Sequence, residues 1–126
     1  MQNKYVNEHN NCDLCTDKIN CIDNHVVYQI KCKKCDDRYV GMTNNGWNIR
    51  GRQHQRAVRL KDETNALGQH VKLKHENEII SFNDFDKEVL YRNNNNKLTA
   101  IQESKIIKET KPEMNRRFEC VDKGYV

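Results

Sequence analysis

Apolar residues are scarce in this sequence of 126 residues, of which 36% are hydrophobic and 32% are charged. No uninterrupted apolar run approaches the roughly 20 residues that a membrane-spanning helix requires, and no signal-peptide pattern opens the chain. We therefore expect no membrane partner and an intracellular location, in the nucleus if the source is eukaryotic. The length suits one domain, and a core this small often needs a bound metal or disulfides for stability.

The sequence also carries little net charge, +4 from 22 Lys and Arg against 18 Asp and Glu. That excess is too modest to establish nucleic-acid binding. Its distribution is more informative, because the segment from Arg50 to Lys61 holds five Lys and Arg and no acid. Such local clusters bind phosphates, although from charge alone a solvated helix face is the simpler interpretation.

What the sequence does have is cysteine, six residues in a short chain. In a reducing compartment, cysteines at these spacings are more naturally metal ligands than disulfide partners. We divide the chain into a cysteine-containing N-terminal segment (1–25), one folded domain (26–116) and a tail (117–126). Cys120 falls in that tail and is interpreted as an incidental thiol.

Hydrophobic periodicity predicts short strands and helices between polar turns. We expect strands at Val26–Lys31, Arg38–Met42 and Glu88–Arg92, and helices at Trp47–Lys61, Thr64–Lys74 and Leu98–Glu109. The first two strands would form a hairpin with a Cys-x-x-Cys at its tip. Together these elements predict a compact α+β domain with a small, mostly antiparallel three-stranded sheet flanked by helices.

The helix expected from Trp47 aims ionisable side chains at its apolar face. At about 100° per residue, Arg50 and His54 share a face with Trp47. A structural ion pair or a hydrogen-bonded core histidine would explain that pair by itself. Three further arginines fall together on the opposite side: Arg52, Arg56 and Arg59.

The last expected helix has the same feature. Glu103 projects between Ile106 and Ile107, where a carboxylate requires an arginine or a metal ion as its partner. A salt bridge would explain Glu103 alone. Three inward-facing ionisable groups in one small domain instead indicate an active site.

At this point the residues resemble the GIY-YIG family of nucleases. Val26-Val27-Tyr28 and Tyr39-Val40-Gly41, separated by ten residues, resemble the two halves of the family's motif. Four further positions match in order and spacing over residues 26 to 115: Arg50, His54, Glu103 and Asn115. The chain departs from the pattern in having VVY for GIY and Gly51 in place of an apolar residue, which we expect to weaken the helix by about 1 kcal/mol.

The resemblance implies a divalent-metal-dependent DNA endonuclease that hydrolyses phosphodiester bonds, with a catalytic Mg²⁺ or Mn²⁺ held by Glu103. Arg50 would neutralise charge that builds up on the phosphoryl oxygens. Tyr28 would orient or deprotonate the attacking water, and His54 is an alternative base. Because a free tyrosine has a pKa near 10, Tyr28 would need a nearby positive charge to act as a base.

The other matched positions have supporting roles in the family pattern. Tyr39 would position water or phosphate, and Asn115 would brace the site by hydrogen bonds. DNA is the implied partner, with the outer arginines (Arg52, Arg56 and Arg59) as a candidate binding surface. Cutting both strands with one active site would require two events or a dimer, and specificity would come from the domain itself or from a targeting partner.

Within the family, the chain is most similar to the nucleases of Penelope-like retroelements. These resemble it in carrying a Cys-x-x-Cys between the two tyrosine motifs and a histidine pair downstream. Here the corresponding residues are Cys32, Cys35, His70 and His75. Two cysteines and two histidines suit a tetrahedral structural zinc.

Cys12, Cys15 and Cys21, with His25, form a second candidate set. Their spacing allows a second zinc, with Cys12 and Cys15 among its ligands. It also allows Cys12 and Cys15 to complete a four-cysteine site with the hairpin pair, which would release the two histidines.

Two other functions compete with the nuclease. The first is a catalytically inactive, zinc-stabilised DNA-binding module derived from such an enzyme. The second is a zinc-finger interaction protein that grips phosphates with its basic helix, which leaves the inward-facing Arg50 and Glu103 unexplained.

Overall fold

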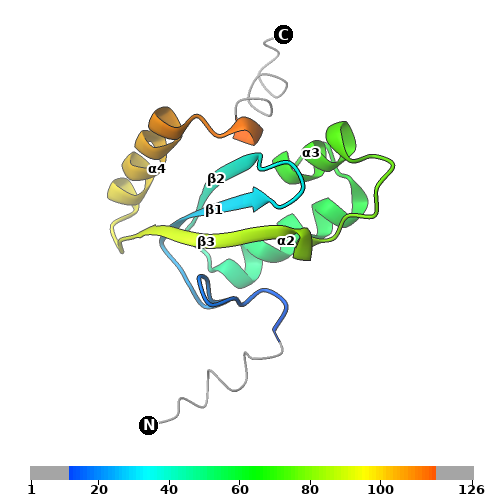
Figure 1. Cartoon of the computed structure of the whole chain (residues 1–126). Coiled ribbons are helices and arrows are strands. Elements are labelled where there is room, and N and C mark those ends of the chain that lie inside the picture. The colour runs from blue at the N-terminus through cyan, green and yellow to red at the C-terminus, as the bar shows by residue number, and fades with distance from the viewer. Residues whose placement is uncertain (1–11, 116–126) are drawn as a thin grey trace.

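A three-stranded antiparallel sheet organises the computed structural model of this protein, which describes residues 12–115. The strands are β1 (Val26–Cys32), β2 (Arg38–Thr43) and β3 (Phe85–Arg92), in the order β2-β1-β3. Figure 1 shows α2 and α3 together on one side of the sheet and α4 apart from α3. The predicted α+β class and the small antiparallel sheet flanked by helices are confirmed.

The β1–β2 hairpin forms where β-branched and aromatic residues predict it. Four alternate side chains of β1 are buried against the core, because a strand directs every second residue to the same face: Val26, Tyr28, Ile30 and Cys32. At the hairpin tip, Cys32 N–H donates to the Asp37 carbonyl at 2.8 Å, and Asp36 adopts a left-handed φ of 66°. The Cys-x-x-Cys pair therefore lies in a tight turn.

Helix α2 (Trp47–Leu60) has the predicted helical phase. Its buried residues are Trp47, Gly51, His54, Ala57 and Val58. The helix ends at Lys61, which takes a left-handed conformation and donates its N–H to the Ala57 and Val58 carbonyls. Helix α3 (Ala66–Lys74) follows at once, and the Asn65 side chain caps it by accepting from Leu67 N–H.

Strand β3 begins three residues before the predicted Glu88. Phe85 pairs with Cys32 and Lys87 pairs with Ile30, so both extend the ladder. The alternation of apolar and polar residues that predicts a strand fails at Lys87, because this charged residue is buried. Its ammonium lies 4.3 Å from the Phe82 ring centroid and donates to the Phe82 carbonyl. Phe82 belongs to a short 3-10 turn, η1 (Phe82–Asp84).

Helix α4 (Asn96–Thr110) begins two residues before the predicted Leu98. The Asn95 side chain caps it by accepting from Lys97 and Leu98 N–H, and Lys111 ends it in a left-handed conformation. Asn95 and Asn96 therefore form the start of this helix. Helix α4 contacts all three strands.

The described part of the N-terminal segment packs onto the main domain. Leu14, Ile19 and Cys21 are buried in the same core as β1 and α2. The Trp47 indole N–H donates to the Leu14 carbonyl at 2.9 Å. A Cβ on Gly51 would come within 3.0 Å of the Trp47 ring and 3.2 Å of Leu14, so this glycine makes room for the segment.

Among residues 12–115, no helix has the length and apolar character needed to cross a membrane. Residues 1–11 of the N-terminal segment and the predicted tail 117–126, with Cys120, lie outside the described residues.

Candidate functional site

Tyr28, Arg50 and His54 form one hydrogen-bonded cluster between β1 and α2. The Tyr28 hydroxyl lies 2.8 Å from His54 Nε2, and Arg50 Nε donates to the same hydroxyl at 3.2 Å. Tyr39 contacts the cluster from β2, with its ring centroid 5.4 Å from that of His54 and 6.2 Å from that of Tyr28. The structure thus brings together four side chains from three elements, β1, β2 and α2, that span residues 28 to 54 of the sequence.

The hydrogen bonds show which group donates and which accepts in this cluster. His54 Nδ1 lies 3.3 Å from Asn65 Oδ1, an oxygen that also accepts from Leu67 N–H. An amide oxygen can only accept, so Nδ1 carries the His54 proton and Nε2 is left as an acceptor. Tyr28 therefore donates its hydroxyl proton to His54 while it accepts from Arg50.

Burial and charge set the protonation states. Burial, reinforced by the neighbouring Tyr39, raises the pKa of Tyr28 well above its usual value, and the opposing effect of Arg50 does not offset this rise. Burial also raises the pKa of Tyr39. The pKa of His54 falls to about 3, first through burial and then through the Arg50 charge. At neutral pH the tyrosines are protonated and His54 is an uncharged proton acceptor.

Glu103 reaches this cluster from α4. Its side chain is half-buried, as are Ile106 and Ile107 on the same helix. Its charge acts on both tyrosines and raises the pKa of each as one of the smaller contributions. All five ionisable or phenolic residues of the predicted catalytic set are therefore close enough to interact: Tyr28, Tyr39, Arg50, His54 and Glu103.

The sixth predicted residue, Asn115, holds the backbone next to the site. Its amide donates to the Val40 carbonyl at 2.8 Å and its oxygen accepts from Val40 N–H at 2.7 Å. Strand β2 is at the edge of the sheet, so Asn115 satisfies backbone groups that no fourth strand pairs with. Through Val40, Asn115 fixes the strand that contains Tyr39.

Gly41 lies opposite Tyr28 in the β1–β2 register. A Cβ on Gly41 would come within 2.7 Å of both the Tyr28 hydroxyl and the Tyr39 ring. The glycine of the second motif is therefore needed for space, since any side chain there would push the two tyrosines apart.

Beside Arg50 the surface is hollowed into a cavity of about 340 Å³. Its walls comprise residues 42–45 with Ile49, Arg50 and Gln53. Gln53 accepts from Arg50 at 2.8 Å and so helps to fix the guanidinium at the edge of this cavity. The Arg50 guanidinium therefore places a positive charge at the cavity, next to the buried hydrogen bonds of Tyr28 and His54.

The outer arginines of α2 are exposed, as predicted. They line a second hollow with residues 80–83. Arg52 is engaged within the protein, since it pairs with Asp13 at 2.9 Å and bonds Gln55 at 2.8 Å. Arg56 and Arg59 are the more accessible pair for an anionic partner.

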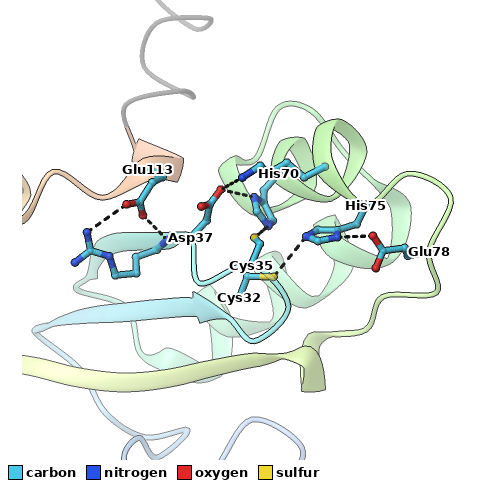
Figure 2. Close-up of polar contacts among 9 residues, drawn as sticks. Cys32, Cys35, Asp37, His70, His75, Glu78 and Glu113 are labelled. Carbon is cyan, nitrogen blue, oxygen red and sulfur yellow. Dashed lines mark hydrogen bonds and ion pairs between the residues drawn. The ribbon is translucent and has the colours of Figure 1, made fainter.

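The hairpin tip and α3 together form a candidate metal centre (Figure 2). Cys32 Sγ lies 3.6 Å from His75 Nε2, and Cys35 Sγ lies 3.5 Å from His70 Nε2. All four ligand atoms lie within 4.8 Å of one another. For a tetrahedral zinc with Zn–S near 2.3 Å and Zn–N near 2.0 Å, neighbouring sulfur and nitrogen atoms are about 3.5 Å apart. This cluster could hold a metal ion such as zinc.

A carboxylate lies behind each histidine, at hydrogen-bond distance from His75 and at ion-pair distance from His70. His75 Nδ1 lies 2.8 Å from Glu78, and His70 Nδ1 lies 3.6 Å from Asp37. Protons on these nitrogens leave both Nε2 lone pairs directed at the cysteines, as Figure 2 shows. A second layer of carboxylates behind ligating histidines is typical of zinc sites.

The N-terminal cysteines form a separate group. Cys12, Cys15 and Cys21 also bring their sulfurs within 4.8 Å of one another. The alternative four-cysteine site is wrong, because these thiols cluster with each other and not with the hairpin pair. His25 does not join either group among the described residues; its Nδ1 lies 2.9 Å from Asn96 Oδ1 instead.

The sequence did not indicate three residues that support the two sites. Asn65 sets the tautomer of His54, Glu78 bonds His75, and Asp37 lies at ion-pair distance from His70. The only local signals were an asparagine at a helix start and acids close in sequence to a ligand.

Comparisons with protein-family models, curated proteins and solved structures gave no match to this chain.

Proposed function

We propose that this protein is a divalent-metal-dependent DNA endonuclease of the GIY-YIG type, with a structural zinc. The observation that carries the proposal is the linked set Arg50–Tyr28–His54–Asn65 beside an open cavity, with Glu103 close to its tyrosines. A purely structural cluster has no need for a cation and two phenols around an uncharged histidine, with a carboxylate whose charge acts on both phenols.

Each residue has a distinct task in this proposal. Arg50 neutralises the developing negative charge on the phosphate. Tyr28 orients the attacking water, and its hydroxyl is held by the hydrogen bond to His54 Nε2, which burial keeps uncharged. Tyr39 confines the phosphate, and Asn115 keeps its strand in place. Because Tyr28 is protonated at neutral pH, its use as the base would require a bound cation to lower its pKa, and His54 is the alternative base.

Glu103 fits the catalytic cation. A half-buried carboxylate close to two phenol groups is the hard oxygen ligand that Mg²⁺ or Mn²⁺ prefers, and Mg²⁺ needs few protein ligands. When bound, the ion would polarise the scissile phosphate and stabilise the leaving oxygen.

Zinc on Cys32, Cys35, His70 and His75 would have a structural task. Four protein ligands leave no open position for a substrate. The ion would connect the tip of the β1–β2 hairpin to α3, which matters because the hydrophobic core of this domain is small.

DNA is the proposed partner, held by Arg56 and Arg59 and by Arg50 at the cavity. A second function has support from one observation: Tyr28 and His54 are fully buried, which shields them from substrate. A DNA-binding module without cleavage is therefore the runner-up.

The test is a plasmid-cleavage assay with zinc-loaded protein in Mg²⁺ or Mn²⁺. The wild type is expected to nick or linearise the plasmid, and Glu103→Gln should lose at least about 100-fold in rate. Glu109→Gln is the matched control, since Glu109 is an exposed glutamate on the same helix, and it should cut normally.

The outcomes separate the two functions. A wild type that binds plasmid but cuts it in neither Mg²⁺ nor Mn²⁺ is the binding module. Equal rates for wild type and Glu103→Gln would remove Glu103 from the mechanism while leaving the nuclease itself in place.

A further inference from the structure

A second group of sulfurs lies outside the sites described so far. Cys12, Cys15 and Cys21 converge, although no helix or strand connects them. Cys21 N–H donates to Cys15 Sγ at 3.2 Å, and Cys15 N–H donates to the Cys12 carbonyl at 3.2 Å. A backbone N–H directed at a sulfur stabilises the negative charge that a metal-bound thiolate carries.

The turn between these cysteines is built to keep the sulfurs together. The Thr16 hydroxyl accepts from both Lys18 and Ile19 N–H, and Thr16 N–H donates back to the Ile19 carbonyl. Leu14 and Ile19 are buried on either side, so the loop is anchored at two points. A tetrahedral zinc would require sulfur separations of about 3.8 Å, and the three atoms are all within 4.8 Å.

We propose that Cys12, Cys15 and Cys21 bind a second zinc ion as three thiolates. No other Cys, His, Asp or Glu of residues 12–115 joins the group, so the fourth ligand comes from outside it. A disulfide would use only two of the three sulfurs and leave their convergence unexplained.

This second zinc would also stabilise the start of α2. That helix has no side-chain cap. Its first N–H groups donate to the N-terminal segment instead: Trp47 to the Asp23 carbonyl at 2.7 Å and Asn48 to the Cys21 carbonyl at 2.8 Å. A metal held by Cys21 therefore fixes the acceptors of the helix that carries Arg50 and His54. The inference does not depend on nuclease activity.

Zinc content per chain tests the proposal directly. The wild type, purified with a thiol reductant and loaded with zinc, should contain two zinc ions. Cys12→Ser and Cys15→Ser should each contain one. His25→Ala is the matched control, because His25 bonds Asn96 and joins neither cysteine group among residues 12–115, and it should keep both ions.

The fluorescence of Trp47, the only tryptophan, gives a second readout. Its indole N–H bonds the Leu14 carbonyl between two of the cysteines. Loss of the second zinc should release the segment and shift the Trp47 emission to longer wavelength in both cysteine variants but not in His25→Ala.

Alkylation of the wild type tests the site even if the variants fail to fold. In zinc-loaded protein, Cys12, Cys15 and Cys21 should resist alkylation together and become reactive together after chelation. One zinc in the wild type that both variants retain would overturn the proposal. Rapid alkylation of Cys12 and Cys15 in the loaded protein would do the same, as would a disulfide among the three.

Discussion

Among single residues, Tyr28, Arg50 and His54 each supply the hydrogen-bond partner that another of them needs. A buried hydroxyl or imidazole without a partner costs about 1–3 kcal/mol. Here Arg50 donates to Tyr28, Tyr28 donates to His54, and His54 donates to Asn65. The chain of donors explains how a 14-residue helix with an inward arginine and histidine remains stable.

His54 should make the stability of the fold depend on pH. Its pKa is about 3 in the folded protein and about 6.5 when unfolded. Below about pH 6.5 the unfolded chain therefore binds a proton at His54 that the folded protein does not bind. The contribution of His54 to the free energy of unfolding is complete above about pH 6.5 and is lost as the pH falls toward 3. Between pH 7 and 5 the wild type should lose about 2 kcal/mol from this residue alone.

The measurement is the free energy of unfolding against pH for the wild type and His54→Gln, with zinc saturating. The glutamine cannot titrate, so the advantage of the wild type over the variant should shrink by that amount between pH 7 and 5. An unchanged difference over this range would show that His54 is not buried as a neutral group.

Among the elements, the hairpin tip and α3 depend on each other through the four-ligand cluster. Helix α3 has nine residues, too few to be stable alone in water. The β1–β2 hairpin tip has two exposed lysines and little apolar surface. A metal between them would supply the stability that neither element has.

His70→Ala should therefore lose one zinc and lower the melting temperature together. Loss of a structural zinc removes several kcal/mol, which corresponds to a fall of roughly 20 °C or more for a domain of this size. Zinc content and thermal unfolding are to be measured on the same samples.

His25→Ala is the matched control for that experiment. His25 bonds Asn96 and joins neither cysteine group among residues 12–115, so its loss should leave zinc content unchanged. If His70→Ala keeps its zinc, or loses it without a change in melting temperature, the ion is not structural.

For the whole molecule, the end of the described chain closes the fold. Residues 113–115 return from α4 to the edge strand β2. Glu113 accepts from Arg38 N–H at 3.0 Å (its ion pair with Arg38 is drawn in Figure 2), and Asn115 pairs with Val40. These contacts fix the chain that follows α4, which contains Glu103, to β2, which contains Tyr39.

Asn115→Ala should destabilise the protein by about 2–3 kcal/mol, because it leaves the buried N–H and carbonyl of Val40 without partners. Chemical denaturation gives the value. Asn94→Ala, at an exposed position, should change stability by less than about 0.5 kcal/mol. Equal effects of the two substitutions would contradict the closing role of Asn115.

The sequence predicted six elements to within three residues at each boundary, because their patterns are local. Strand β3 was placed three residues late since Lys87 is a buried charge, which alternation cannot reveal. The Cys32, Cys35, His70 and His75 group followed from spacing and a family resemblance. Its carboxylate partners did not, because Asp37 and Glu78 resemble any other surface acids in the sequence.

The sequence by itself determined the helical phase that turns Arg50 and His54 inward and Arg52, Arg56 and Arg59 outward, because a repeat of 3.6 residues is a property of the backbone. It also determined the β1–β2 hairpin, because the alternation of side chains along a strand is a property of the backbone too. Tertiary structure alone decided that the His54 proton faces Asn65, that the N-terminal thiols cluster apart from the hairpin pair, and that Asn115 pairs with β2. These contacts join residues up to 75 positions apart in the sequence, and which residues meet is set by how the helices and the N-terminal segment pack on the sheet.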